Sequence, residues 1–234
     1  MSLDRSNSFS KEILNDKFNM TLEQNIFYAK RNIIDIIWKS AHIEGINVTY
    51  PQTDVIYNGG IVSGLSVDEI TAINNLKWAW RFLLDNLEAS TDFSFICKLN
   101  SLVGSNLIYG SGYPRKFDVS IGGTKWKPEL PDSYSIKDKV DSYIKSLKGS
   151  LTENSLDLCL FLMRSQIFPD GNKRTSMLIA NKMLIENGKG ILSIPVELKD
   201  KFGELLIRYY ESDNPSEIKK FLYGNCIDGI VVKE

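Results

Sequence analysis

Residues 166–175 read QIFPDGNKRT, and we expect two helices to meet at this stretch. Residues 156–163 lead into it and residues 177–185 lead out of it, and both runs repeat apolar side chains at helical spacing. A proline and a glycine between them predict a turn. The turn gathers a carboxylate, a carboxamide, an ammonium and a guanidinium at a helix start, where unpaired N–H groups and the dipole favour anions. The residues therefore indicate a phosphate site, with Asp170 as the ligand of a metal ion.

A turn that serves only the fold is the alternative, because Pro, Asp, Gly and Asn are ordinary turn residues. Lys173 and Arg174 argue against it, since cations at a helix start oppose the dipole by about 0.3–1 kcal/mol and an anionic ligand would remove that conflict. In this interpretation Asp170 binds Mg²⁺, Gly171 lets the backbone approach a phosphate, and Arg174 offers a planar fork of donors. Asn172 offers its side-chain N–H groups and caps the helix.

Residues 168–174 resemble the signature loop of the Fic/Doc family, which reads His, any residue, Phe, any residue, Asp or Glu, Gly, Asn, Gly or Lys, and Arg. The fit begins at Phe168, whose ring we expect to be buried beneath the loop. In that family the acidic residue binds the metal ion, and the Asn and first Arg bind phosphates. The resemblance therefore implies Mg²⁺ and ATP as cofactors, with the phosphates held by Gly171, Asn172, Lys173 and Arg174. Most adenylylating members have Gly at the position of Lys173, and the Lys form is seen in the Doc branch, which phosphorylates its target.

Two positions depart from the family pattern. The family's His, which takes the proton from the target hydroxyl, falls on Gln166, and its second Arg falls on Met177. An amide accepts no proton near neutral pH, and loss of a general base costs about 10²–10⁴ in rate. The single His of the chain is His42, outside the loop. Other candidate bases, none of them persuasive, are Cys159, Asp170 and Glu44. We therefore expect a weak enzyme, an enzyme with another base, or a nucleotide-binding pseudoenzyme.

Residues 40–45 read SAHIEG and resemble the inhibitory motif of Fic proteins, which is Ser or Thr, three residues, Glu, and then Gly or Asn. The motif lies N-terminal to the loop, as in the class that carries its own inhibitory helix. The resemblance implies that Ser40 and Glu44 form this motif and that Glu44 obstructs the γ-phosphate position. The usual partner of that Glu is the second Arg, so here we expect Glu44 to meet Arg174 or Lys173. A helix end with a solvated Glu is the alternative.

Residues 117–121 alternate apolar and polar side chains, as a half-buried strand does, and two glycines follow. We expect a short β-hairpin over residues 117–127. In the Fic family a flap before the signature loop pairs with an extended segment of the target protein through backbone bonds. The flap residues and further contacts that the resemblance implies are Val119, Ser120, Ile121, Arg115 and Trp126. A surface hairpin that only covers the core is the alternative.

The other helical patterns are separated by turn signals, and we expect helices over residues 22–43, 66–87, 92–107, 135–147, 152–165, 172–187, 196–212 and 216–223. Residues 47–64 are turn-rich, and residues 226–232 predict a terminal strand. The fold class is therefore all-α, an orthogonal helical bundle with one short β-hairpin, which the Fic resemblance also implies. Residues 1–64 form an N-terminal helical segment with the inhibitory-type motif, and residues 65–234 form the Fic-like core domain.

The chain of 234 residues is long enough for one domain with a real core, since 43% of its residues are hydrophobic. Its net charge of −1 lacks the basic excess of duplex-binding proteins, so nucleic acid is not expected as a partner. No apolar run approaches the roughly 18 residues that span a bilayer, and the N-terminus shows no secretory signal. We expect a cytoplasmic protein without a membrane partner and with reduced cysteines. The sequence leaves open whether the protein forms a homodimer.

The leading hypothesis is a Fic-family nucleotide-binding protein, related to the adenylyltransferases that transfer AMP from ATP to hydroxyls of target proteins. Such a transfer depends on positioning and on charge stabilisation. It would be weak or absent here because Gln166 replaces the catalytic His. One alternative is a non-catalytic protein-binding module on a Fic fold, which Gln166 and Met177 favour. The other is a Doc-like protein phosphotransferase, which only Lys173 suggests.

Overall fold

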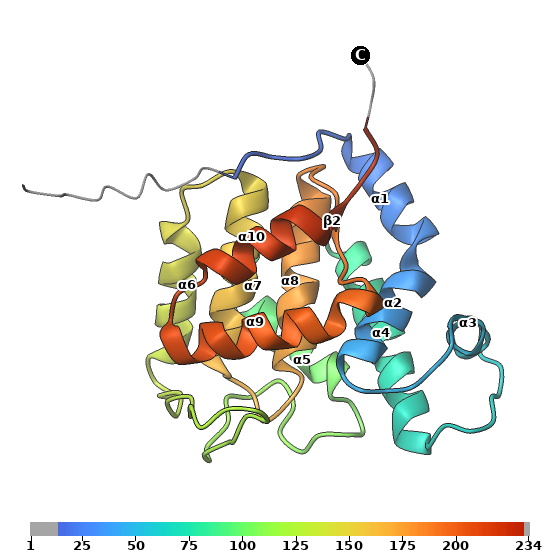
Figure 1. Ribbon diagram of the computed structural model, residues 1–234, viewed down its shortest axis with the longest axis horizontal. Helices are drawn as coiled ribbons and strands as arrows, with labels where there is room; N and C mark the ends of the chain where they lie inside the picture. Colours follow the sequence, from blue (N-terminus) through green and yellow to red (C-terminus); the bar gives the residue numbers. More distant parts are fainter. Residues whose placement is uncertain (1–13, 232–234) are drawn as a thin grey trace, which may run out of the picture.

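The computed structural model describes residues 14–231, and Figure 1 shows them as a bundle of helices. The helices are α1 (Leu22–Arg31), α2 (Ile33–Ile43), α3 (Tyr50–Tyr57), α4 (Val67–Asp85), α5 (Phe93–Val103), α6 (Ile136–Ser146), α7 (Leu151–Ser165), α8 (Asn172–Glu186), the 3-10 helix η1 (Val196–Leu198), α9 (Lys199–Ser212) and α10 (Ser216–Asn225). Two short strands, β1 (Ile191–Leu192) and β2 (Ile227–Asp228), pair antiparallel. The expected all-α class is confirmed.

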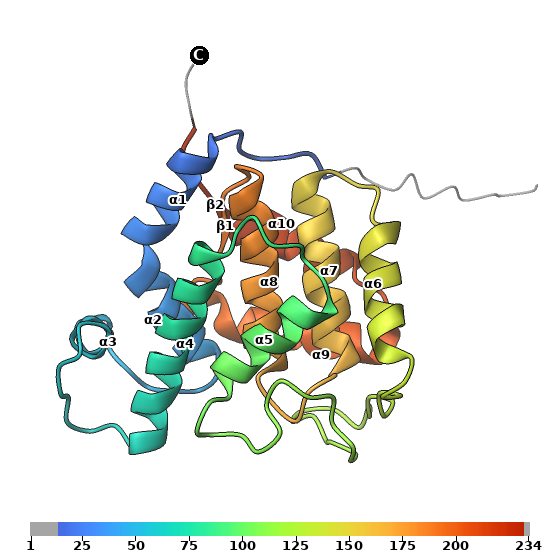
Figure 2. The same cartoon turned by 180° about the vertical axis from the view of Figure 1, so that it is seen from behind.

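Helices α7 and α8 stand side by side at the centre of the bundle, and the other helices pack around them (Figures 1 and 2). Figure 1 shows α9 and α10 crossing in front of α7 and α8, and Figure 2 shows α4 and α5 on the opposite side. Every residue of α8 from Arg174 to Ile185 is buried. One apolar cluster joins α8 to α1, α2, α4 and α5, and a second joins α7 and α8 to α9 and α10. From Met177 onward, α8 is therefore held by packing from two sides.

The helix expected over residues 22–43 is interrupted at Asn32, which separates α1 from α2. Asn32 has φ −101° and ψ 8°, and its Nδ2 donates to the carbonyl of Tyr28 over 2.8 Å. Short polar side chains compete with the helical bonds of the backbone in this way. The prediction of a single helix is wrong because the apolar periodicity continues across the break, so that Ala29 and Ile33 lie in the same cluster.

Residues 50–57 form α3 within the stretch expected to be only turns. Thr49 begins the helix, because its Oγ1 accepts from the N–H of Gln52 and its N–H donates to Oε1 of Gln52. This reciprocal pair is a capping box. The turn-rich prediction is wrong for these residues. Pro and Gly are typical of turns, but here the Thr-x-x-Gln signal begins a helix that has Pro51 in its first turn.

Residues 117–127 form no paired strands, so the expected hairpin is corrected to an extended loop that turns at Gly122 and Gly123. The alternation of side chains has another cause, because Ile121 and Trp126 pack against the second apolar cluster. The sheet lies elsewhere, where Ile191 pairs with Asp228 and Leu192 pairs with Ile227. The terminal strand is confirmed at residues 227–228, and residue 232 of that prediction lies outside the described residues.

The cysteines expected to be reduced are free thiols at Cys97, Cys159 and Cys226. Between residues 14 and 231, no helix is both long and apolar enough to cross a bilayer. The division of the chain at residue 64 stays a prediction. Helices α1 and α2 contribute to the same apolar cluster as α4 and α5.

Candidate functional site

The turn between α7 and α8 begins at Gln166, whose backbone is left-handed with φ 44° and ψ 51°. This conformation costs a residue other than Gly about 1–2 kcal/mol, so other contacts must hold it. The carbonyl of Gln166 accepts a hydrogen bond from Nε of Arg115 over 2.7 Å, and the carbonyl of Ile167 accepts one from the N–H of Arg115 over 2.8 Å. Gly171, with φ 74°, ends the turn and precedes α8. The reversal between the two central helices is therefore fixed at both ends.

The side chain of Gln166 is buried and uses its hydrogen-bonding capacity inside the protein. Its Nε2 donates to the carbonyl of Met163 over 2.7 Å and to Oη of Tyr210 over 3.3 Å. Its Oε1 accepts from Nδ2 of Asn172 over 3.2 Å. Burial raises the pKa of Tyr210 despite its bond with Gln166, so the phenol stays protonated. The side chain of Gln166, which stands at the position expected for a proton acceptor, thus links α7, α8 and α9 by hydrogen bonds. An amide accepts no proton near neutral pH.

Asn172 is the first residue of α8, and its side chain turns back to the loop. Its Oδ1 accepts from the N–H of Phe168 over 3.0 Å, and its Nδ2 donates to the carbonyl of Phe168 over 2.9 Å. The expected cap is therefore corrected, because Gly171 occupies the cap position and Asn172 bonds to the turn. Phe168 is buried, as the sequence predicted. The side-chain N–H groups of Asn172 are occupied, which leaves its backbone N–H for a ligand.

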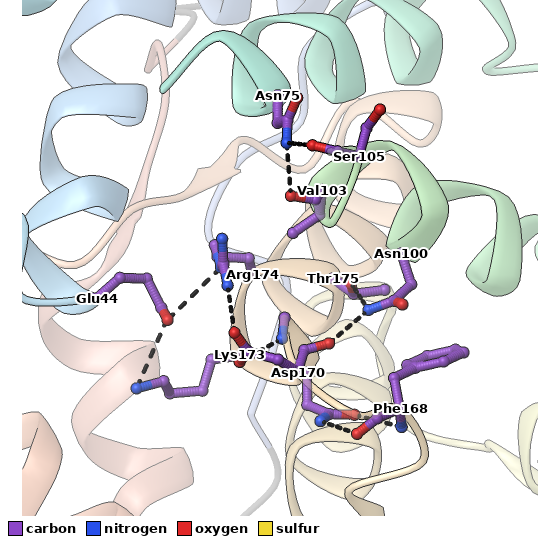
Figure 3. A network of polar contacts seen from close by, with 12 residues as sticks. Glu44, Asn75, Asn100, Val103, Ser105, Phe168, Asp170, Lys173, Arg174 and Thr175 are labelled. Carbon is purple, nitrogen blue, oxygen red and sulfur yellow. Dashed lines mark hydrogen bonds and ion pairs between the residues drawn. The ribbon is translucent and has the colours of Figure 1, made fainter. Parts of the chain in front are cut away.

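Asn100, on α5, holds the other side of the turn, as Figure 3 shows. Its Nδ2 donates to the carbonyl of Asp170 over 3.0 Å and to Oγ1 of Thr175 over 3.1 Å. Its Oδ1 accepts from the N–H of Gly112 over 2.8 Å. No sequence motif pointed to Asn100 or Tyr210. A single Asn on the otherwise apolar buried face of α5 was the signal that could have found the first of them.

The carboxylate of Glu44 lies beside both cations at the start of α8 (Figure 3). Its Oε1 is 3.6 Å from Nζ of Lys173, and its Oε2 is 3.5 Å from Nε of Arg174. Nη2 of Arg174 is 3.3 Å from Oδ2 of Asp170. Charges of alternating sign therefore run from the end of α2 to the turn. Ser40 is buried one helical turn before Glu44. The inhibitory role of both residues stays a prediction.

The ion pairs of Glu44 are longer than hydrogen bonds. Within residues 14–231, Oε1 of Glu44 and Nε of Arg174 are buried without a hydrogen-bond partner, although most such atoms have one. Gly171 gives α8 no side-chain cap, and in the described part of the chain the N–H groups of Asn172, Lys173 and Arg174 donate no hydrogen bond. The start of α8 thus places unpaired donors beside two cations, an arrangement suited to an anion.

Asp170 is the carboxylate that reaches solvent at this turn, with 61% of its side chain exposed. Its Oδ1 accepts from the N–H of Gly171 over 2.6 Å. Among residues 14–231, no group of three His, Cys, Asp or Glu side chains could hold a metal ion. One exposed carboxylate suits Mg²⁺, which keeps several waters and takes further ligands from phosphates. A metal ion at Asp170 would therefore depend on an anionic ligand.

The flap, residues 117–127, lies against α9. Trp126 stacks on Tyr210 with ring centroids 5.1 Å apart, and the guanidinium of Arg164 lies 5.1 Å from the Trp126 ring. Arg115 is 1% exposed and therefore cannot be the target contact that the sequence suggested. The ring of Trp126 is partly buried between Arg164 and α9, and its contact with a target stays a prediction.

The expected flap residues keep an accessible backbone. Ser120 is exposed, and Val119 and Ile121 are half-buried. In the described part of the chain, the backbone groups of residues 118–121 make no backbone hydrogen bonds. An extended peptide could therefore pair with this segment, although the segment has no strand partner of its own.

Two hollows flank the turn. One of about 250 Å³ lies between the end of α2 and α9, and Lys173 lines it with Ile43, Lys199, Asp200, Phe202, Gly203, Glu204 and Leu206. The other, of about 720 Å³, lies under the flap between α6, α7 and α9, and its lining includes Trp126, Arg164 and Ser165. The smaller hollow adjoins Lys173, and the larger one adjoins Ser165, the residue before Gln166. Neither hollow is lined by Asp170 or Arg174.

Two other groups named from the sequence do not replace the missing base. Cys159 is buried in α7, and burial raises the pKa of its thiol. His42 donates from Nε2 to the carbonyl of Val48 over 2.7 Å and packs edge-on against Trp38. His42 therefore holds the segment that follows α2.

The sequence matches no family model and no curated protein. The structure is similar to a Fic domain containing signaling protein from Bacteroides thetaiotaomicron, with a TM-score of 0.72, 17% identity, and coverage of 88% of this chain and 86% of that one. It is also similar to Fic-1 from C. elegans, with a TM-score of 0.74, 18% identity, and coverage of 84% and 62%. A Fic family protein from Desulfovibrio desulfuricans gives a TM-score of 0.70, 16% identity, and coverage of 86% and 65%. The chain thus spans less than two thirds of the last two proteins. From the architecture and these likenesses together, the chain has the fold of Fic-domain proteins.

Proposed function

We propose that this protein binds ATP with Mg²⁺ at the start of α8 and derives from protein adenylyltransferases, with transfer weakened or lost at Gln166. One observation carries the proposal. Lys173 and Arg174 lie beside unpaired N–H groups of a helix start, and their carboxylate partner Glu44 is held at 3.5 and 3.6 Å without hydrogen bonds. A polyphosphate would supply the hydrogen bonds that Glu44 does not make.

Each residue of the turn has a part in this proposal. Gly171 and the backbone N–H of Asn172 approach the phosphates, while Lys173 and Arg174 neutralise their charge. Asp170 holds Mg²⁺, which would supply charge stabilisation to the phosphates when it is bound. Ser40 and Glu44 act as the inhibitory motif, because Glu44 competes with the anion for both cations. The region of residues 118–121 receives an extended segment of an unknown target protein.

The transfer itself requires a proton acceptor. A target hydroxyl oxygen would bond to the α-phosphorus, the bond from that phosphorus to the β-phosphate oxygen would break, and diphosphate would leave. The hydroxyl proton must pass to a base, and Gln166 cannot take it. Loss of the base lowers the rate by about 10²–10⁴. We therefore expect the protein to bind ATP, and we expect the transfer of AMP to be slow or absent.

Calorimetric titration with ATP, with and without Mg²⁺, tests the binding step. We expect the wild type to bind weakly, Glu44→Gly to bind more tightly, and Arg174→Ala to lose binding. Arg81→Ala is the matched control, because Arg81 is an exposed Arg of α4 that the proposal gives no role. Absence of Mg²⁺-dependent binding in both the wild type and Glu44→Gly would refute the proposed function.

Transfer of label into protein tests the chemistry. ATP labelled at the α- or the γ-phosphate would be incubated with Glu44→Gly and with the double variant Glu44→Gly, Gln166→His. Incorporation of the α-label in the double variant would indicate an adenylyltransferase that has lost its base. Incorporation of the γ-label would indicate a Doc-like phosphotransferase and would contradict the adenylyl assignment.

A non-catalytic protein-binding module is the second candidate, and the closed network around Gln166 favours it. Gln166, Asn172 and Phe168 satisfy one another, and Met177 is buried in the second apolar cluster. A site that keeps these contacts needs no ligand to be stable. This candidate predicts no ATP binding in any variant.

A further inference from the structure

Arg115 is a buried cation at the base of the flap. It is 1% exposed, and it is among the largest fully buried side chains of the protein. It lies two residues after the exposed Tyr113 and two residues before Phe117, the first residue of the flap. A guanidinium is rarely buried unless its donors are satisfied, so the partners of Arg115 show what holds it there.

All the hydrogen-bond partners of Arg115 are backbone carbonyls. Its Nη1 donates to Phe117 over 2.7 Å, and its Nη2 donates to Pro128 over 3.3 Å and to Glu129. These bonds tie together the two ends of the flap. Its Nε donates to Gln166 and its backbone N–H donates to Ile167. These bonds tie the flap base to the turn before α8.

The shape of the guanidinium makes this set of contacts specific to Arg. Its five N–H donors lie in one plane and point in fixed directions, which matches carbonyls arriving from separate segments. Lys carries the same charge with three donors on one atom and cannot reproduce the fork. A replacement of Arg115 by Lys therefore separates the effect of charge from the effect of geometry.

We infer that Arg115 is a positioning residue that fixes the flap base and the left-handed turn at Gln166 as one unit. The bond from Nε holds the carbonyl of Gln166, and the backbone bond holds that of Ile167. Through this turn Arg115 sets where Asn172 and the unpaired N–H groups of α8 lie. The inference about structure stands by itself, and its consequence for a ligand rests on the proposed function.

Amide hydrogen exchange measured by NMR tests the structural part. The N–H of Phe168 reports on the turn, because Oδ1 of Asn172 protects it, and the N–H of Trp126 reports on the flap, because Oγ1 of Thr124 protects it. We expect Arg115→Lys to accelerate exchange at both sites by roughly tenfold or more, since a buried charge-assisted bond and its geometry are lost.

Asn25→Ala is the matched control. Asn25 is also fully buried, and it also bonds to a loop backbone, through the carbonyl and the N–H of Gly190. Loss of the Asn25 side chain should accelerate amide exchange near Gly190 and leave the exchange rates of Phe168 and Trp126 unchanged. If Arg115→Lys accelerates exchange at Trp126 and not at Phe168, Arg115 serves the flap alone and the inference is overturned. Acceleration at all sites in both variants would show global loosening and would overturn it as well.

Titration with ATP and Mg²⁺ tests the consequence for the ligand. We expect Arg115→Lys to weaken binding by roughly 10-fold, as loss of outer partners of a binding site often does, and Asn25→Ala to leave it unchanged. Wild-type affinity in Arg115→Lys would show that the fork of Arg115 does not govern the binding site and would overturn this consequence of the positioning role. If the wild type does not bind ATP, the proposed function fails, and the exchange measurement still decides the structural inference.

Discussion

Glu44 at the end of α2 and Arg174 in the first turn of α8 are neighbours in space, with Oε2 of the first 3.5 Å from Nε of the second. The pair is almost buried, with 16% of the Glu44 side chain and 8% of the Arg174 side chain exposed. An ion pair that is buried but too long for a hydrogen bond gains little from its geometry. A stronger acceptor, such as a phosphate oxygen, can therefore displace the carboxylate of Glu44 from Arg174.

Replacement of Glu44 by Gln should raise the affinity for inorganic pyrophosphate. Removal of the competing charge leaves Lys173 and Arg174 free, and we expect an increase of about tenfold, which corresponds to about 1.4 kcal/mol. Calorimetric titration at two salt concentrations would measure it, with the larger gain at low salt. Glu88→Gln changes the net charge equally from an exposed position and is the control. An equal gain in both variants would show a general effect of charge.

Replacement of Asn100 should loosen the turn from its far side. Asn100→Ala leaves the N–H of Gly112 and the carbonyl of Asp170 without their partner, and each such loss costs about 1–3 kcal/mol. Asn100→Asp keeps the acceptor for Gly112 and loses the donors to Asp170 and Thr175. Urea unfolding would measure both variants, and amide exchange at Gly112 should rise in Asn100→Ala much more than in Asn100→Asp. Similar exchange in the two variants would contradict this division of roles.

Replacement of Trp126 by Ala should release the flap from α9. The ring is stacked between Tyr210 and the Arg164 guanidinium, and such contacts contribute about 1–2 kcal/mol. Trypsin would report the release, because it cleaves after lysines and the flap carries Lys125, whose bond to residue 126 is a cleavable site. We expect faster cleavage there. Trp78→Ala, at a Trp that is 48% exposed on α4, should leave cleavage of the flap unchanged.

Acid should weaken the contact between α5 and α6. Burial alone would raise the pKa of Asp141, but hydrogen bonds from Lys137 and from the N–H of Phe93 lower it overall. A carboxylate with a lowered pKa stabilises the fold above its unfolded pKa of about 3.9 and loses this effect as pH falls through the folded value. Asp141→Asn should therefore be less stable than the wild type at neutral pH and nearly equal to it once the pH has fallen below the lowered folded pKa of Asp141.

Urea unfolding across that pH range measures the difference. Glu88→Gln is the control, because Glu88 is exposed and its replacement should change stability by less than about 0.5 kcal/mol at any pH. A constant difference between Asp141→Asn and the wild type at all pH values would show that the charge of Asp141 has no part in it.

The central turn and most helices could be predicted from the sequence because their signals are local. A capping box at Ser66 and Glu69 begins α4, and Gly188, which has a positive φ, follows the end of α8. The break at Asn32 and the loop over residues 117–127 could not be predicted, because periodicity records which side chains meet the core and leaves open how the backbone pairs.

The candidate site divides in the same way. Residues 166–175 were found from their own chemistry, whereas Asn100, Tyr210 and the burial of Arg115 depend on contacts across 44 to 70 positions of the chain. The loop pattern also suggested that the Asn172 side chain was available for a ligand. The bonds of Asn172 to Phe168 and Gln166 follow from the left-handed backbone of Gln166. No residue in the loop pattern predicts that backbone conformation.

The pairing of β1 with β2 has a practical consequence for any study of this molecule. It draws the last described residues to the C-terminal end of α8, where residue 20 also bonds to Gly188 (Figure 1). A helix of 15 residues is about 22 Å long, so Met20 and the residues after β2 lie roughly that far from the start of α8. A fluorescent label attached to the exposed Val231 would leave the opposite pole of the molecule open to solvent and to incoming molecules.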